Sequence, residues 1–340
     1  MSRIKAAVII LLVIALTTAC NRSDDDDSAT DTDTDTDTDT DTDVDTDTDT
    51  DTDTDTDTET EIPDPPPGCE GVITFPDSDL EIAVRYYADI PEGDIYYEDV
   101  WDVKYLTTVD FDLQVEDITN IHCLNGLEEL CLYRFTSIIN PDYENGIKDL
   151  SPLSTLTQLE ELDISGHWLE DLSDISTLVN LTQLGLLANL VTDLTPVAGM
   201  SNLESIYMQH NQISDLSPLF GLINLETIRA GDNQITDVSP LSSLSNLSTL
   251  SLNENPISDI SALGSLTNLQ VLDLNNCQLT DIEAVEYMVS LEGLSVNRND
   301  ISDLSPVTPL VGLHGIDISS NPIEDLGPLE GKTELYSLNC

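Results

Sequence analysis

The segment Leu203–Asn224, LESIYMQHNQISDLSPLFGLIN, shows the pattern that decides the fold. The pattern reads Leu-x-x-Leu-x-Leu-x-x-Asn-x-Ile-x-Asp-Leu-Ser-Pro-Leu-x-x-Leu-x-Asn and recurs every 22 residues, in eight consecutive units from Leu159 to Glu334. Residues two apart point to the same face of a strand, so the last two leucines of Leu-x-x-Leu-x-Leu predict a short strand with one buried face. Because one unit cannot bury its own leucines, neighbouring units must stack side by side as a solenoid.

Incomplete copies flank the eight strict units. Upstream, Leu127–Gln158 is a copy with a 10-residue insertion, and Leu106–Gly126 is a copy shortened by one residue. Downstream, Leu335–Cys340 matches the opening strand of a further unit. The pattern therefore predicts an α/β solenoid over 106–340, with a parallel sheet on its concave side and short helices or 3₁₀ turns on its convex side.

Two polar positions repeat with the leucines. The ninth position carries an amide that can satisfy backbone groups buried by the sharp turn after the strand. This ladder comprises Asn189, Asn211, Asn233, Asn255, Asn299 and Asn321, with His167 and Cys277 as substitutes. The thirteenth position is Asp in every strict unit, from Asp171 to Asp325, with Asp149 in phase upstream. Two interpretations stay open for this column: carboxylates that cap turns by accepting backbone N–H groups, and a ladder for divalent cations.

Ser-Pro pairs follow the Asp column at 151–152, 217–218, 239–240 and 305–306. Ser is a preferred N-cap residue and Pro is favoured in the first turn of a helix. We therefore expect each Ser to cap a short convex helix or 3₁₀ turn.

The repeat resembles the bacterial leucine-rich repeats of the internalin type. The resemblance implies a horseshoe with a small helical N-terminal cap, which we expect at 69–105. Within it, Pro76-Asp77-Ser78-Asp79 precedes an apolar stripe at Leu80, Ala83, Val84 and Tyr87, which is typical of a helix. The chain departs from internalins because it has no Leu-Pro-x-Thr-Gly wall anchor, no following immunoglobulin-like domain and no evident C-terminal cap.

The first 68 residues contain no pattern for a folded core. Residues 1–19 combine Arg3 and Lys5 with the apolar run 6–16, which is too short to span a bilayer and predicts an export signal. The segment resembles a bacterial lipoprotein signal with Cys20 as the lipidated residue, which implies an outward-facing outer membrane lipoprotein; ordinary secretion is the alternative. Residues 20–68 are then a disordered spacer, rich in Asp-Thr alternation and closed by Pro63 and Pro65–Pro67.

Charge restricts the classes of partner. The chain has 66 acidic and 10 basic residues, a formal net charge of −56, and the excess is not confined to the spacer. Nucleic acid is excluded because phosphate binding needs a basic surface. Anionic lipid is excluded as a direct partner for the same reason, so any membrane contact is expected through the lipid anchor alone.

The concave sheet face is the first candidate binding surface. Curved solenoids bind along this face, and hot spots favour Tyr, Arg and exposed apolar groups. Tyr207 and Arg229 fall on adjacent strands within reach of a stacking contact, and Leu187 is expected to be turned out of the core beside them. The hypothesised patch for an unidentified protein or peptide ligand comprises Leu187, Tyr207, Gln209, His210, Arg229 and Asn253.

The insertion at 133–146 is a second candidate. It brings together residues that are scarce in this chain: Tyr133, Arg134, Phe135 and Tyr143. It is either a binding loop at the rim of the concave face or a segment folded back over the cap.

The cysteines allow several pairings. Cys20 is assigned to the lipid and Cys277 to a buried thiol in the ladder. Cys69 can bridge to Cys123 or Cys131, of which Cys123 is favoured.

We find no sequence motif of an enzyme. Gly-x-Ser-x-Gly, phosphate-binding loops and His-Glu-x-x-His are absent, and no cysteine pair has zinc spacing. We therefore expect no catalytic residues, no cofactor and no metal. The function we predict is non-catalytic protein binding at the cell surface; a structural or self-associating envelope protein and a calcium-dependent surface protein are the alternatives.

Overall fold

The computed structural model describes residues 62–109, 113–134 and 145–340. Residues from Asp64 to the last residue form one compact unit. The predictions for the export signal, Cys20, most of the spacer, Phe135 and Tyr143 fall outside the described residues. No helix among the described residues is long and apolar enough to cross a bilayer.

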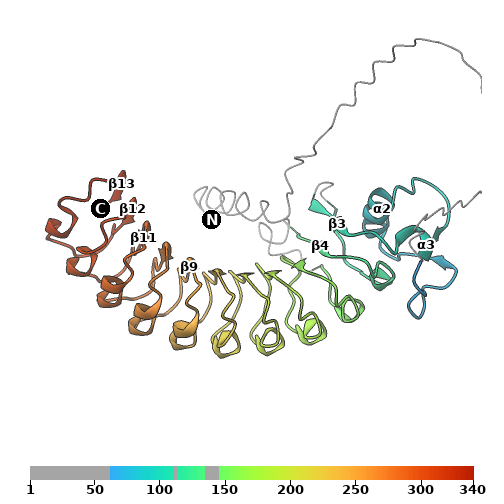
Figure 1. The fold of residues 1–340 in the computed structure, drawn as a ribbon, viewed down its shortest axis with the longest axis horizontal. Helices are drawn as coiled ribbons and strands as arrows, with labels where there is room; N and C mark the ends of the chain where they lie inside the picture. Colours follow the sequence, from blue (N-terminus) through green and yellow to red (C-terminus); the bar gives the residue numbers. More distant parts are fainter. Residues whose placement is uncertain (1–61, 110–112, 135–144) are drawn as a thin grey trace, which may run out of the picture. The chain divides into compact units, whose positions relative to one another are not determined.

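The repeats build one sheet of eleven short parallel strands, in strict chain order (Figure 1). Between β5 and β13 each residue pairs with the residue 22 positions further along, as in Ile206 with Ile228. The leucine-rich-repeat solenoid predicted from the sequence is therefore confirmed. The strands are β3 (Tyr105–Thr107), β4 (Glu129–Cys131), β5 (Glu161–Asp163), β6 (Gln183–Gly185), β7 (Ser205–Tyr207), β8 (Thr227–Arg229), β9 (Thr249–Ser251), β10 (Val271–Asp273), β11 (Gly293–Ser295), β12 (Gly315–Asp317) and β13 (Ser337–Asn339).

The convex side of the unit is made of short 3₁₀ helices, as expected from the Ser-Pro pairs (Figure 1). Each coil returns from strand to strand through one such turn, so the strands line the inner side of the arc. The turns are η2 (Ile121–Cys123), η3 (Ser151–Leu153), η4 (Ser173–Ile175), η5 (Thr195–Val197), η6 (Ser217–Leu219), η7 (Ser239–Ser243), η8 (Ser261–Ser265), η9 (Glu283–Tyr287), η10 (Ser305–Val307) and η11 (Gly327–Leu329).

The core is the row of stacked apolar side chains between sheet and turns. In the unit Leu203–Asn224 the seven apolar residues of the pattern are at most 3% exposed: Leu203, Ile206, Met208, Ile213, Leu216, Leu219 and Leu222. Full burial of one such side chain contributes about 1.5–3 kcal/mol. Because each side chain packs on the same position of neighbouring coils, this energy is gained only when the coils stack.

The N-terminal end of the solenoid is closed by α2 (Ser78–Tyr87) and α3 (Tyr97–Val100), with a two-stranded antiparallel sheet of β1 (Val72–Ile73) and β2 (Ile95–Tyr96). Asp77 caps α2, since its Oδ1 accepts hydrogen bonds from the backbone N–H groups of Asp79 (2.9 Å) and Leu80 (3.1 Å). The predicted apolar stripe is buried at Leu80, Ala83 and Val84. Tyr87 completes it with an edge-to-face contact to Tyr105 of β3, 5.3 Å between ring centres.

A disulfide joins the residues that precede the cap helix to the first coil. Cys69 and Cys123 are bonded, with 5.6 Å between their Cα atoms, and both are fully buried. The pairing favoured from the sequence is confirmed. Cys277 is a buried free thiol, as predicted, and Cys340 is exposed.

Two details of the repeat assignment were wrong. Leu106 pairs with Leu130, so Leu106 occupies the fourth position of its coil and not the first. The coil begins near Val103 and is not shortened; the buried Thr108 at its sixth position hid the pattern.

The second correction concerns the Ser-Pro pairs. Ser217 is the first residue of η6 and not its cap. Its N–H is satisfied by Asp215, two residues earlier, whose Oδ1 accepts it at 2.7 Å.

Candidate functional site

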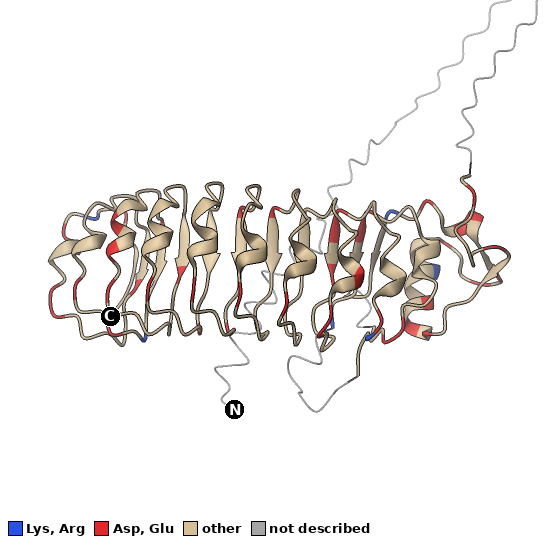
Figure 2. Ribbon diagram, turned by 90° about the horizontal axis from the view of Figure 1, so that it is seen from below, with Lys and Arg blue, Asp and Glu red and all other residues tan. Residues whose placement is uncertain are grey.

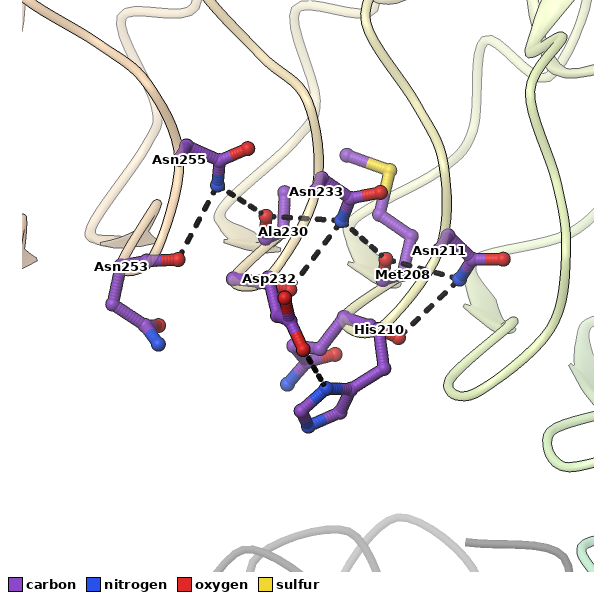
Figure 3. Close-up of polar contacts among 10 residues, drawn as sticks. Met208, His210, Asn211, Ala230, Asp232, Asn233, Asn253 and Asn255 are labelled. Carbon is purple, nitrogen blue, oxygen red and sulfur yellow. Dashed lines mark hydrogen bonds and ion pairs between the residues drawn. The ribbon is translucent and has the colours of Figure 1, made fainter. Parts of the chain in front are cut away.

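The ladder of ninth-position asparagines holds the concave-side turns in a fixed position (Figure 3). The Nδ2 group of Asn233 donates to the carbonyl oxygens of Met208 in the preceding coil (2.9 Å) and Ala230 in its own coil (3.1 Å). Its Oδ1 accepts from the backbone N–H of Ile213 at 2.9 Å. One amide thus joins two coils and satisfies three buried backbone groups, as predicted. The same contacts recur at the other ladder positions, Asn189, Asn211, Asn255, Asn299 and Asn321.

His167 reproduces both roles of the amide. Its Nε2 lies 2.6 Å from the carbonyl oxygen of Leu132, and its Nδ1 accepts from the backbone N–H of Ile147 at 3.2 Å. The ring is therefore neutral, with the proton on Nε2. Burial lowers the pKa of His167 from 6.5 to about 4, because a charged ring inside the core lacks solvent.

Cys277 reproduces only one of the two roles. Its Sγ donates to the carbonyl oxygen of Leu252 at 3.2 Å. It offers no amide oxygen to the preceding coil, so the N–H of Ile257 bonds to the backbone oxygen of Asn255 instead, at 2.8 Å. Burial raises the pKa of the Cys277 thiol to about 12, which keeps it protonated.

The thirteenth-position Asp column caps the convex turns. Every member accepts the backbone N–H two residues later at 2.7–3.1 Å, from Asp149 to Asp325. These hydrogen bonds lower the pKa of Asp237 and Asp303 because they favour the charged carboxylate. The capping interpretation accounts for the whole column.

The centre of the predicted concave patch is present in the structure. The Arg229 guanidinium carbon lies 5.8 Å from the centre of the Tyr207 ring, so the expected stacking contact is confirmed. Both side chains are half-buried and stand on β7 and β8, at the middle of the eleven strands. A cation over an aromatic face is stabilised by about 0.5–2 kcal/mol.

His210 and Asn253 lie just beyond the strand ends. The Nδ1 of His210 is 2.7 Å from Oδ2 of Asp232 in the next coil, and both side chains are exposed (Figure 3). Asn253 is half-buried, and its Oδ1 accepts a hydrogen bond from Ser251 Oγ at 2.9 Å. The structure thus brings together four of the six predicted patch residues on the accessible face: Tyr207, His210, Arg229 and Asn253.

The other two patch residues are buried, so the exposed apolar group expected at Leu187 is wrong. Leu187 is 2% exposed and Gln209 is 5% exposed, although Leu187 does lie outside the main apolar core. The register places Ser165, Leu187 and Gln209 next to one another at the seventh position of adjacent coils. Neighbouring side chains in such a row shield one another, which the pattern of a single unit does not reveal.

The described start of the insertion is tied to the first coil. Arg134 is only 2% exposed; its guanidinium donates to Gln114 (3.1 Å) and pairs with Glu116 (3.2 Å). Tyr133 is also buried, and burial raises its pKa. Arg134, a candidate binding residue of the insertion, is therefore a buried structural link between adjacent coils. Phe135 and Tyr143 lie outside the described residues.

One group of possible metal ligands exists in the described part of the chain. Ligand atoms of Cys69, His122 and Cys123 lie within 4.8 Å of one another. Both sulfurs are consumed by the disulfide, so the oxidised protein offers only an imidazole there.

Comparisons with known proteins agree with this geometry. A family model described as leucine-rich repeats (2 copies) matches residues 201–243, 223–265, 245–287 and 267–309. The chain is 34% identical to internalin C2 from Listeria monocytogenes, over 72% of this chain and 94% of that one, with a TM-score of 0.58. The chain belongs to the internalin-like family of leucine-rich-repeat proteins. No curated protein matches it.

The solenoid of this internalin-like protein is also shared with more distant structures. A TDR receptor is 21% identical, with 72% of this chain and 44% of that chain covered and a TM-score of 0.62. The plant peptide hormone receptor RGFR1, in complex with RGF2, is 20% identical, with 68% and 38% covered and a TM-score of 0.54. At this identity the likeness shows a common fold.

A second surface of the internalin-like chain was missed in the sequence. A groove of about 450 Å³ runs along the edge of the sheet where the strands begin. Its walls come from the second and last positions of successive units, and from Gln158 to Asn224 they recur with the same period of 22 residues. The lining residues are Glu128, Gln158, Glu160, Asn180, Thr182, Asn202, Glu204 and Asn224. This recurrence was the available signal. Three of the lining residues are acidic, Glu128, Glu160 and Glu204, and Asp and Glu recur along the ribbon of the solenoid (Figure 2).

Proposed function

We propose that this internalin-like protein is a non-catalytic binding module that takes a protein or peptide ligand on its concave sheet. The observation that carries the proposal is the stack of Tyr207 on Arg229 at the middle strands of a curved surface. Binding hot spots are enriched in Tyr and Arg and cluster near the centre of an interface. The polar strands on either side serve as the rim.

The acidic surface acts at longer range than this patch. A net charge of −56 speeds the encounter with basic partners and slows it with acidic ones. Such steering falls steeply with salt, since charges are screened over about 8 Å at physiological ionic strength.

Selection of binders from a displayed library of random peptides tests the concave face. The full chain is the bait, and each selected peptide is measured against Tyr207→Ala/Arg229→Ala and against Phe220→Ala/Ile223→Ala. Phe220 and Ile223 are exposed on the convex side and form the matched control. We expect at least about tenfold weaker binding to the concave variant, as loss of a hot spot of 1.4 kcal/mol or more implies, and no change for the control. The proposal is contradicted by peptides that bind Tyr207→Ala/Arg229→Ala as tightly as wild type, or that lose affinity for Phe220→Ala/Ile223→Ala.

We further propose that the protein is anchored at the cell surface through a lipid on Cys20, with residues 21–68 as the spacer. The support for export and lipidation is a short apolar run at 6–16, followed by the small residues 17–19 and Cys20. Metabolic labelling with an alkyne fatty acid tests the anchor: wild type is expected in the membrane fraction and labelled, and Cys20→Ala unlabelled and released. Label retained by Cys20→Ala contradicts the anchor, and protease added to intact cells distinguishes an outward from an inward orientation.

A further inference from the structure

Arg229 has no acidic partner among the described residues; the same is true of Lys148, Arg298 and Lys332, and of these four cations Arg229 is the one on a strand of the concave sheet. Three described cations, Arg85, Lys104 and Arg134, each pair with a carboxylate at 3.2 Å or less. Arg229 makes no ion pair with any described residue, although the chain has 66 acidic groups. The contact with the Tyr207 ring uses no N–H group in an ion pair, so the guanidinium N–H groups are left as donors.

The described residues that lie directly beside Arg229 on the sheet are uncharged. Thr227 precedes it on β8, Gly231 follows just beyond the end of that strand, and Ser251 stands beside it on β9. The next carboxylate along the same row is Asp273 on β10, two strand spacings or about 10 Å away. Asp273 accepts the backbone N–H of Asn275 at 3.1 Å. The half-buried guanidinium thus lies beside neutral groups, where attraction to an additional anion is less screened than in water.

Gln209 supplies an acceptor just below the same face; it is 5% exposed, so its side chain must turn outward for Oε1 to meet a ligand. It follows Tyr207 by two residues, so both side chains point to the concave side. Its Oε1 is buried and has no hydrogen-bond partner among the described residues. A buried acceptor without a partner costs about 1–3 kcal/mol, which a donor from a ligand would recover.

We propose that Arg229 and Gln209 form a receptor for a carboxylate and an adjacent peptide N–H of the ligand. This inference rests on the proposed function and names the chemistry of its central contact. Two kinds of ligand group fit the pair: the C-terminal residue of a polypeptide, and an Asp or Glu residue within a polypeptide. Both carry a carboxylate within a few bonds of a main-chain N–H, and a guanidinium edge matches a carboxylate in a bidentate manner. The ligand carries this carboxylate in an otherwise neutral or basic sequence, because the surface around the site repels acidic segments.

NMR of the Arg Nε–H groups in the full chain tests the site, and Arg298 provides an internal control. Arg298 is exposed, and no stacking partner or ion pair is found for it among the described residues. The probes are N-acetylglycine for a terminal carboxylate, the N-acetyl N-methylamides of Asp and Glu for side-chain carboxylates, and N-acetylglycine N-methylamide as the neutral control. We expect at least one carboxylate probe to shift Arg229 with saturation, while Arg298 moves little. The probe with the lower Kd identifies the source.

Variants separate this contact from general charge attraction. Arg229→Gln removes the saturable shift of the Tyr207 ring signals, and Arg229→Lys weakens binding because the fork of donors is lost. Gln209→Met, which keeps the volume, is expected to weaken N-acetylglycine about tenfold and to leave acetate unchanged, since acetate has no N–H. Arg298→Gln, the same exchange at an exposed cation outside the patch, is expected to retain binding, and the thermal midpoint of each variant identifies any that fails to fold.

Equal shifts at Arg229 and Arg298, or saturation of Arg229 by the neutral probe, overturn the inference. The carboxylate receptor can be rejected without rejecting the proposed binding function. Peptides that need Tyr207 and Arg229 but carry no required carboxylate leave the binding face intact and reject only the receptor for carboxylates.

Discussion

The Asn ladder and the Asp column repeat with the same period and both accept backbone N–H groups, yet they differ in every other respect. Asn233 is 8% exposed and bonds to two coils, whereas Asp215 is exposed and bonds only within its own turn. An unpaired charge at a buried position costs free energy, because it loses its hydration. The amide also donates to carbonyl oxygens that a carboxylate would repel. An exposed turn gains from a carboxylate, which is the stronger acceptor. Solvent, therefore, selects the residue type at two otherwise similar positions.

The largest effect is expected when a carboxylate replaces an amide in the buried Asn ladder. Asn233→Asp turns a donor into a second acceptor facing the carbonyl oxygens of Met208 and Ala230, and it buries a charge without a partner. We expect a loss of about 3–5 kcal/mol in the free energy of unfolding, measured with urea at pH 7. A loss below about 1 kcal/mol would show that the ladder is open to water.

The second prediction concerns the ladder position occupied by a titratable ring. The folded pKa of His167 is about 4, below the ordinary 6.5, so the folded protein binds its proton less readily than the unfolded chain. Its contribution to stability is present above pH 6.5 and is lost as the pH falls from 6.5 towards 4. Over this range the loss is about 3 kcal/mol.

His167→Asn tests that prediction with a matched background. The amide can donate to Leu132 and accept from Ile147, so the ladder is kept while the titration is removed. All other acid-sensitive groups are shared, so the difference between the two stability curves isolates His167. Parallel curves from pH 7 to 4 contradict the assignment of a neutral, buried ring.

A smaller effect, of opposite sign, is expected at the ladder position with a missing acceptor. Cys277→Asn restores the oxygen that Ile257 lacks and adds a second donor, so the unfolding free energy should rise by about 1 kcal/mol. Cys277→Ser, which adds no amide, is the control. Destabilisation by Asn together with tolerance of Ser would show that this coil is too narrow for the amide.

The smallest effect is expected for the reverse exchange on the exposed column. Asp215→Asn retains an oxygen that can accept the N–H of Ser217, and solvent compensates for the lost charge. Because the amide is the weaker acceptor, we expect a small fall in the thermal midpoint, far below that of Asn233→Asp. A drop comparable to that of Asn233→Asp would mean that charge, and not acceptance of the N–H, stabilises the convex turns.

The sequence alone determined everything that repeats. The period of 22 residues specified the parallel sheet, the buried leucines, the Asn ladder with its His167 and Cys277 substitutes, and the register that sets Tyr207 opposite Arg229. The physical reason is that each side chain in a solenoid meets the same position of the neighbouring coils, so a contact in one unit predicts the others.

Only the tertiary structure decided the contacts that do not repeat. The burial of Leu187 and Gln209, the link from Arg134 to Gln114 and Glu116, and the true phase of the coil at Leu106 all depend on unlike neighbours. Such contacts are determined by which different side chains fill one row, or by how the first coil meets the cap, and neither follows from the pattern of a single unit. The repeat therefore specifies the scaffold, whereas the particular side chains brought together across its coils specify the binding surface.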